Sequence, residues 1–60
     1  MNIPKDPIML MSFINTQLRD NYDSLSEFVN SNGIDENEIV DKLSAAGYRY
    51  DADKNQFVRG

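Results

Sequence analysis

The residues best placed to bind a metal ion are three oxygen-bearing side chains at alternate positions, Asp51, Asp53 and Asn55. This spacing matches the first half of an EF-hand calcium loop, in which alternate side chains supply the first ligands. The next position of that loop requires a glycine for its sharp turn, and this chain has Gln56 there. We therefore interpret the cluster as turn chemistry, in which Asp and Asn side chains accept hydrogen bonds from their own backbone, and we expect no bound metal.

A second group of carboxylates lies on the segment expected to form the third helix. Its members are Asp35, Glu36, Glu38 and Asp41. Most of them fall in the first turn, where acidic side chains interact favourably with the helix dipole. The chain has no histidine and no cysteine, so neither an imidazole nor a thiolate could complete a transition-metal site. We interpret the group as a solvated acidic surface.

The residues that most enzymes rely on are missing from the sequence. Without histidine or cysteine there is neither an imidazole general base nor a thiol nucleophile, and no glycine-rich phosphate loop or nucleophile elbow is present. Tyr48 and Tyr50 are expected to cover apolar surface while their hydroxyls face water. A chain of 60 residues rarely encloses a pocket of catalytic size. The sequence predicts a protein that is not an enzyme and that binds no cofactor.

The positions of caps, glycines and apolar residues predict one domain of the α+β class, mainly α. It is a three-helix mini-domain that contains a helix-turn-helix and ends in a two-stranded β-hairpin, a short wing. The predicted segments are an arm at 1–5, helices at 7–21, 25–32 and 36–46, and a hairpin at 48–58. In the third helix, Ala46 is expected to face the core with the larger apolar residues.

The predicted ends of these elements follow from particular residue types. Asp6 before Pro7 starts the first helix, and capping boxes are expected to start the second helix (Ser24 with Glu27) and the third (Asp35 with Glu38). Gly33 and Gly47 end the two later helices, since glycine enters the left-handed region freely. In the hairpin loop, Asn55 is expected in the same left-handed region. Ile34 is expected to pack against both neighbouring helix ends.

A helix-turn-helix can bind DNA by placing its second helix in the major groove. Here that helix begins with acidic residues, and ten acidic against six basic residues give the chain a net charge of −4, whereas phosphate attracts Lys and Arg. We therefore expect no nucleic-acid partner. A DNA-binding regulator is kept as the alternative function, with four basic contacts on the third helix and the hairpin: Lys42, Arg49, Lys54 and Arg59.

Two apolar residues of the first helix lie away from its main apolar stripe, which comprises Leu10, Met11, Ile14, Leu18 and Tyr22. Met9 and Phe13 are one turn apart on a flank of that stripe. Either Phe13 packs under the hairpin with Met9 at its edge, or the two residues form a surface for a partner or a second copy. We expect a non-enzymatic protein-interaction module that self-associates through this helix.

The sequence also indicates where the protein acts. No signal peptide is recognisable, because the first residues contain an acid and two prolines where a basic start and an unbroken apolar run are needed. The longest apolar run, Ile8 to Met11, is far shorter than a membrane span. The absence of cysteine suits a reducing compartment. We expect a cytoplasmic protein without a membrane partner.

Several segments together resemble a small bacterial family of uncharacterised domains, numbered 4250 among the domains of unknown function. The resemblance is carried by NIPKDP at 2–7, by GYRYD at 47–51, by NQF at 55–57, and by Leu10, Asn15, Leu18 and Arg19 between them. It covers nearly the whole chain. It implies a bacterial origin and brings no activity, cofactor or catalytic residue with it.

Overall fold

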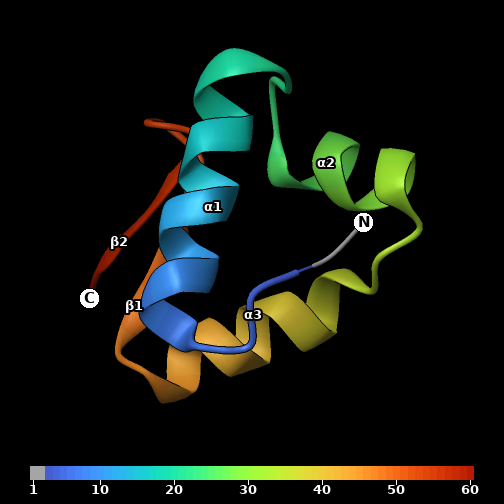
Figure 1. Cartoon of the computed structure of the whole chain (residues 1–60). Coiled ribbons are helices and arrows are strands. Elements are labelled where there is room, and N and C mark those ends of the chain that lie inside the picture. The colour runs from blue at the N-terminus through green and yellow to red at the C-terminus, as the bar shows by residue number, and fades with distance from the viewer. Residues whose placement is uncertain (1–2) are drawn as a thin grey trace.

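A computed structural model describes residues 3–60 and confirms the predicted α+β fold. Three helices, α1 (Pro7–Asp20), α2 (Leu25–Asn32) and α3 (Glu36–Ala45), precede a hairpin of β1 (Tyr48–Asp51) and β2 (Gln56–Arg59) (Figure 1). α1 ends one residue earlier than predicted because Asn21 is already its cap, and α3 does so because Ala46 is its cap. β2 is one residue longer than predicted. Of the predicted arm, residues 1–2 lie outside the described chain, and Ile3 packs against the core.

The predicted caps form, with two corrections to their partners. The Met9 N–H donates to Asp6 Oδ2 at 3.0 Å, and the Glu27 N–H donates to Ser24 Oγ at 3.1 Å. The Glu27 carboxylate, however, accepts from the N–H of Asp23 at 3.2 Å rather than from that of Ser24. The chain enters α2 extended at Ser24, with φ −157° and ψ 161°, and Asp23 is the amide within reach of the carboxylate. Ser24 therefore caps α2 without a reciprocal box.

The turn between α2 and α3 is closed by backbone hydrogen bonds. Gly33 has φ 66°, and the Ile34 N–H donates to the Val29 carbonyl at 2.8 Å, which is the long bond of a Schellman motif. Asp35 then caps α3 through the N–H of Asn37 at 3.0 Å, so its predicted box with Glu38 does not form. An aspartate side chain is short, and here it bonds the amide two residues ahead. Ile34 is half-buried and packs against the core.

One apolar core holds the three helices and the hairpin together. Its buried members are Leu10, Ile14, Leu18, Leu25, Phe28, Val29, Ile39, Leu43 and Phe57. Ala46 is exposed, contrary to the prediction, because α3 has ended by that position and the chain turns toward β1. The partly buried residues around this core include both Tyr48 and Tyr50. The hairpin therefore packs on the helices through its aromatic face.

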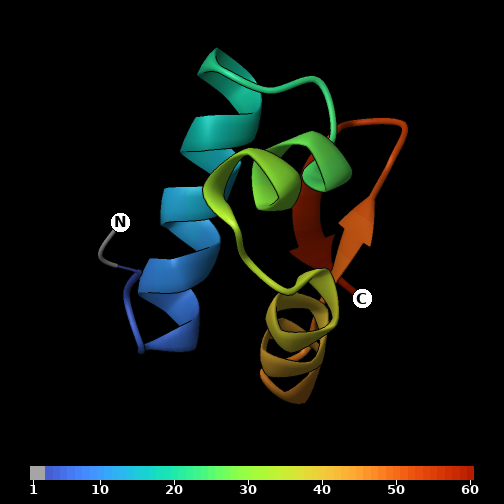
Figure 2. The ribbon, with the colours of Figure 1, turned by 90° about the vertical axis from the view of Figure 1, so that its right-hand side faces the viewer.

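The hairpin lies beside α1 through its second strand. β1 and β2 are antiparallel, with Tyr50 opposite Phe57 and Arg49 opposite Val58. Asn55 has φ 52°, which confirms the expected left-handed residue in the loop. Figure 2 shows α1 on one side, α2 and α3 in the middle, and β1 on the side opposite α1. This order leaves β2 between α1 and β1.

Candidate functional site

Asn15 binds the backbone of β2 as a neighbouring strand would. Its Oδ1 accepts from the Phe57 N–H at 2.7 Å, and its Nδ2 donates to the Phe57 carbonyl at 3.1 Å. The two residues are 42 positions apart in the sequence. The side chain of one helical residue thus satisfies the donor and the acceptor that a β-strand would otherwise leave unpaired at that point.

Asn55 joins the hairpin loop to the end of α1. Its Nδ2 donates to the carbonyls of Leu18 and Tyr22 at 3.1 and 3.0 Å, and its Oδ1 accepts from the Tyr50 hydroxyl at 2.6 Å. That hydroxyl also accepts from the Leu25 N–H, at the start of α2, at 3.2 Å. The prediction that the Tyr50 hydroxyl faces water was therefore wrong, because the loop and α2 supply its partners. We call Asn15, Tyr50 and Asn55 the polar clamp. It links α1, α2 and the hairpin through groups that are partly buried.

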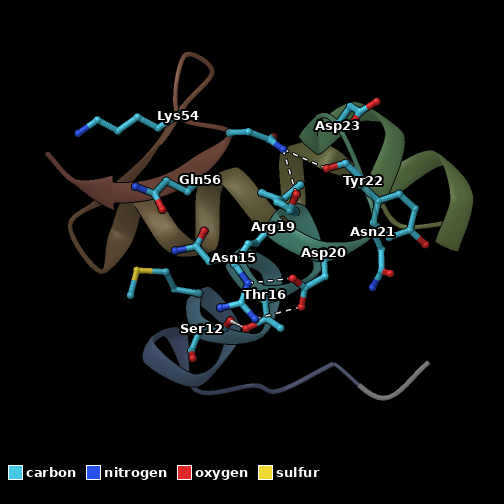
Figure 3. Close-up of a pocket in the computed structure, with 13 residues that line it drawn as sticks. Ser12, Asn15, Thr16, Arg19, Asp20, Asn21, Tyr22, Asp23, Lys54 and Gln56 are labelled. Carbon is cyan, nitrogen blue, oxygen red and sulfur yellow. Dashed lines mark hydrogen bonds and ion pairs between the residues drawn. The ribbon is translucent and has the colours of Figure 1, made fainter.

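A hollow of about 770 Å³ opens beside the polar clamp, between α1 and the hairpin loop (Figure 3). The oxygen and the nitrogen of both clamp asparagines are already bound to other groups of the fold. Around them, Arg19 pairs with Asp20 through two hydrogen bonds of 2.9 and 3.0 Å, while Lys54 extends away from that pair. The clamp asparagines and the Arg19–Asp20 pair of this hollow are therefore already bound to partners within the domain.

The charged pair in this hollow is fully at the surface. The hydrogen bonds from Arg19 lower the pKa of the Asp20 carboxyl, and the same pairing raises the pKa of the guanidinium. Because both groups are in contact with water, solvent and salt screen the interaction. We expect the pair to orient two side chains at the end of α1 without contributing much to folding.

The residues of the clamp fall within a stretch that matches a known protein family. A family described as a domain of unknown function (DUF4250) matches residues 4–57. The chain belongs to this family. No curated protein and no solved structure matches it. Three of the segments or residues that carried the resemblance, Asn15, GYRYD and NQF, supply the polar clamp and the strand that it holds.

The four basic residues assigned to a DNA contact come from different parts of the hairpin and from α3. Arg49 lies opposite Val58, and Arg59 lies opposite Tyr48, near the open end of the hairpin. Lys54 is in the loop at the other end, and Lys42 is on α3. All four are exposed, as are Glu36, Asn37, Glu38 and Asp41 of α3. Any nucleic acid that met α3 would first encounter carboxylates.

The two apolar residues singled out on α1 have different surroundings. Met9 is 63% exposed, whereas Phe13 is half-buried and packs edge-to-face on Phe28 of α2, with 6.4 Å between ring centroids. Phe13 therefore contacts α2. The structure adds Ile8, which is 52% exposed beside Met9. A helical wheel could have found Ile8, because it lies well away from the stripe that contains Leu10 and Ile14.

A second, smaller hollow of about 380 Å³ lies between the arm, the α2–α3 turn and α3. Its walls include the apolar Ile3, Leu10 and Ile39, with Glu38 and Lys42 at the rim. In the described residues no cluster of carboxylates has the geometry of a metal site. Nor does any helix within residues 3–60 have the length and apolar character needed to cross a bilayer.

Proposed function

We propose that this domain is a non-enzymatic interaction module that contacts another protein through the first turns of α1. The observation that carries the proposal is a pair of neighbouring large apolar side chains, Ile8 and Met9, that are 52% and 63% exposed. The core side chains of the same domain are 4% exposed or less, so the exposure of Ile8 and Met9 sets these two residues apart from the core. Together with the half-buried Phe13, one turn after Met9, these residues form what we call the α1 patch.

The character of the α1 patch suits a protein contact. Methionine is flexible and polarisable, and it adapts to partner surfaces of different shape. Exposed apolar side chains gathered at one place favour association, because contact with a partner removes them from water. The polar groups that might have bound a substrate elsewhere are engaged in the polar clamp. This division supports an interaction role over catalysis.

Self-association through the α1 patch is one form of this proposal. A standard interface buries about 800 Å² on each partner, which would be roughly a fifth of the 3992 Å² surface of this chain. Two exposed side chains supply a small part of that area. We therefore expect contact between two α1 patches to be weak, and a stable complex to need a partner that also touches surrounding surface.

Replacing Met9 with glutamate is expected to weaken this contact. A carboxylate in the patch would have to be desolvated against an apolar partner, which costs several kcal/mol unless it is paired. The measurement is capture of partners from native cells by the tagged domain, followed by mass spectrometry and by titration of the purified partner. We expect binding to weaken by at least about tenfold, which corresponds to 1.4 kcal/mol.

The matched control is Thr16→Glu, because Thr16 is also exposed on α1 and the change adds the same charge. Because Thr16 lies two turns further along the same face of α1, this change should weaken binding much less than Met9→Glu does. A partner that binds the wild type, Met9→Glu and Thr16→Glu equally would remove the α1 patch from the proposal. Sedimentation of the same three proteins separates self-association from binding to other chains.

DNA binding is the second candidate, and its support is the shape of the α2–α3 pair. The helices are joined by residues 33–35, a short turn of the kind that a helix-turn-helix uses. The acidic surface of α3 opposes it. We expect no saturable binding of mixed duplex DNA by fluorescence anisotropy at low ionic strength. Binding that falls steeply with added salt would instead favour the DNA-binding function.

A further inference from the structure

The backbone groups of β1 alternate between two directions, and the register shows which residues point outward. The Gly60 N–H donates to the Gly47 carbonyl at 3.1 Å, which extends the ladder of β1 and β2 by one pair. In an antiparallel ladder, hydrogen-bonded and non-hydrogen-bonded pairs alternate. Arg49 and Asp51 therefore bond to β2, whereas the N–H and C=O of Tyr48 and Tyr50 point away from it.

The outward backbone groups at the two edges of this hairpin differ in whether they are hydrogen-bonded. On β2, the outward N–H and C=O of Phe57 are bound by Asn15, which agrees with the alternation deduced from the register. On β1, no group within residues 3–60 makes a hydrogen bond to the outward backbone of Tyr50. Figure 2 shows β1 as the outermost element on the side away from α1, with α2 and α3 extending less far. The edge of β1 is thus open to another strand.

We propose that a second copy of this chain adds its own β1 to this edge, antiparallel, to form a four-stranded sheet across a two-fold axis. In this arrangement Tyr50 lies opposite Tyr50 of the second copy, and each donates its N–H to the carbonyl of the other. An open edge is the usual site of strand addition, in which the backbone supplies the attraction and the side chains set the register.

Charge selects this register over its neighbour. With Tyr50 on the axis, Arg49 lies directly opposite Asp51 of the second copy, and Asp51 lies opposite Arg49 of that copy. Both side chains are on the face of the hairpin that points away from the helices, since Tyr50 and Phe57 occupy the inner face. A register with Arg49 on the two-fold axis would instead place the Arg49 guanidinium groups of the two copies opposite each other, which is unfavourable. The sequence of β1 is therefore complementary to itself.

The first test is a charge exchange at the edge, read by sedimentation equilibrium up to millimolar concentration. Wild type is expected to show a monomer–dimer equilibrium. Arg49→Asp places carboxylates opposite each other twice, and Asp51→Arg does the same with guanidinium groups. Each variant alone should dimerise at least about tenfold more weakly than wild type. An equal mixture of the two should recover dimers, because each Asp then faces an Arg.

The second test is independent of any substitution and covers the case in which Asp51→Arg does not fold. Asp51 Oδ1 accepts from the Asp53 and Lys54 N–H groups, so its loss could disturb the loop. In a mixture of labelled and unlabelled wild type, an isotope-filtered NOE between the Hα atoms of Arg49 and Asp51 of different copies is expected. A monomer at millimolar concentration would overturn the proposal. A dimer that lacks this NOE, or a dimer that Arg49→Asp leaves unchanged, would also overturn it. If Met9→Glu were the only variant to lose the dimer, the contact would belong to the α1 patch instead.

Discussion

Asn55→Ala is expected to lower the free energy of unfolding by about 2–4 kcal/mol. The substitution removes the donors to the Leu18 and Tyr22 carbonyls and the acceptor of the Tyr50 hydroxyl. Each lost hydrogen bond costs about 0.5–1.5 kcal/mol net, and more where a partly buried partner stays unpaired. Alanine at φ 52° adds about 1–2 kcal/mol of backbone strain. Urea unfolding followed by circular dichroism measures the change.

Asn55→Gly separates the two contributions. Glycine loses the same hydrogen bonds but accepts a positive φ without strain, so this variant should be about 1 kcal/mol more stable than Asn55→Ala. Equal stability of the two variants would show that the backbone strain is negligible. A change within about 0.5 kcal/mol of zero in Asn55→Ala would show that the loop is not held to α1 by this side chain.

Phe28→Ala is expected to have the largest effect of any single core truncation, about 3–5 kcal/mol. Phe28 is fully buried, and its ring meets Tyr22 and Phe13 edge-to-face at centroid distances of 5.4 and 6.4 Å. Its removal leaves a cavity where α1 meets α2, together with the loss of both aromatic contacts. A domain of this size has so little stability in reserve that the variant should be largely unfolded at 37 °C.

Phe28→Leu is the control for Phe28→Ala. Leucine keeps an apolar side chain in the site and reduces the cavity, so this variant should lose less than half as much stability and remain folded by thermal melting. A cost below about 1 kcal/mol for Phe28→Ala would mean that the core can close around the gap, which would require α2 to shift toward α1.

The parts of the fold that depend on neighbouring residues were predictable. Caps at Asp6 and Ser24, and the left-handed Gly33 and Asn55, follow from the chemistry of single positions. Short-range detail was less predictable where two acceptors compete, as at Glu27, whose carboxylate bonds Asp23 instead of closing a box. Local sequence predicts that a cap forms more reliably than it predicts which backbone amide the capping side chain bonds.

The polar clamp could not be derived from the sequence, because its contacts join distant positions. Asn15 and Phe57 are 42 residues apart, and nothing in helix periodicity identifies which polar side chain will face a strand. Asn15 belongs to the family resemblance, but its place in the sequence does not indicate its role in the fold. The open edge of β1 was hidden for a related reason, since the direction of a backbone group depends on the register of the partner strand.

The central claim is that the residues that carry the family resemblance hold the hairpin to the helices, which leaves other surfaces for binding. Urea unfolding of Asn15→Ala tests it most directly, because Asn15 joins α1 to β2. The substitution removes both side-chain hydrogen bonds to the Phe57 backbone, so we predict a loss of about 1–3 kcal/mol in the free energy of unfolding. A change within about 0.3 kcal/mol of zero would contradict the claim.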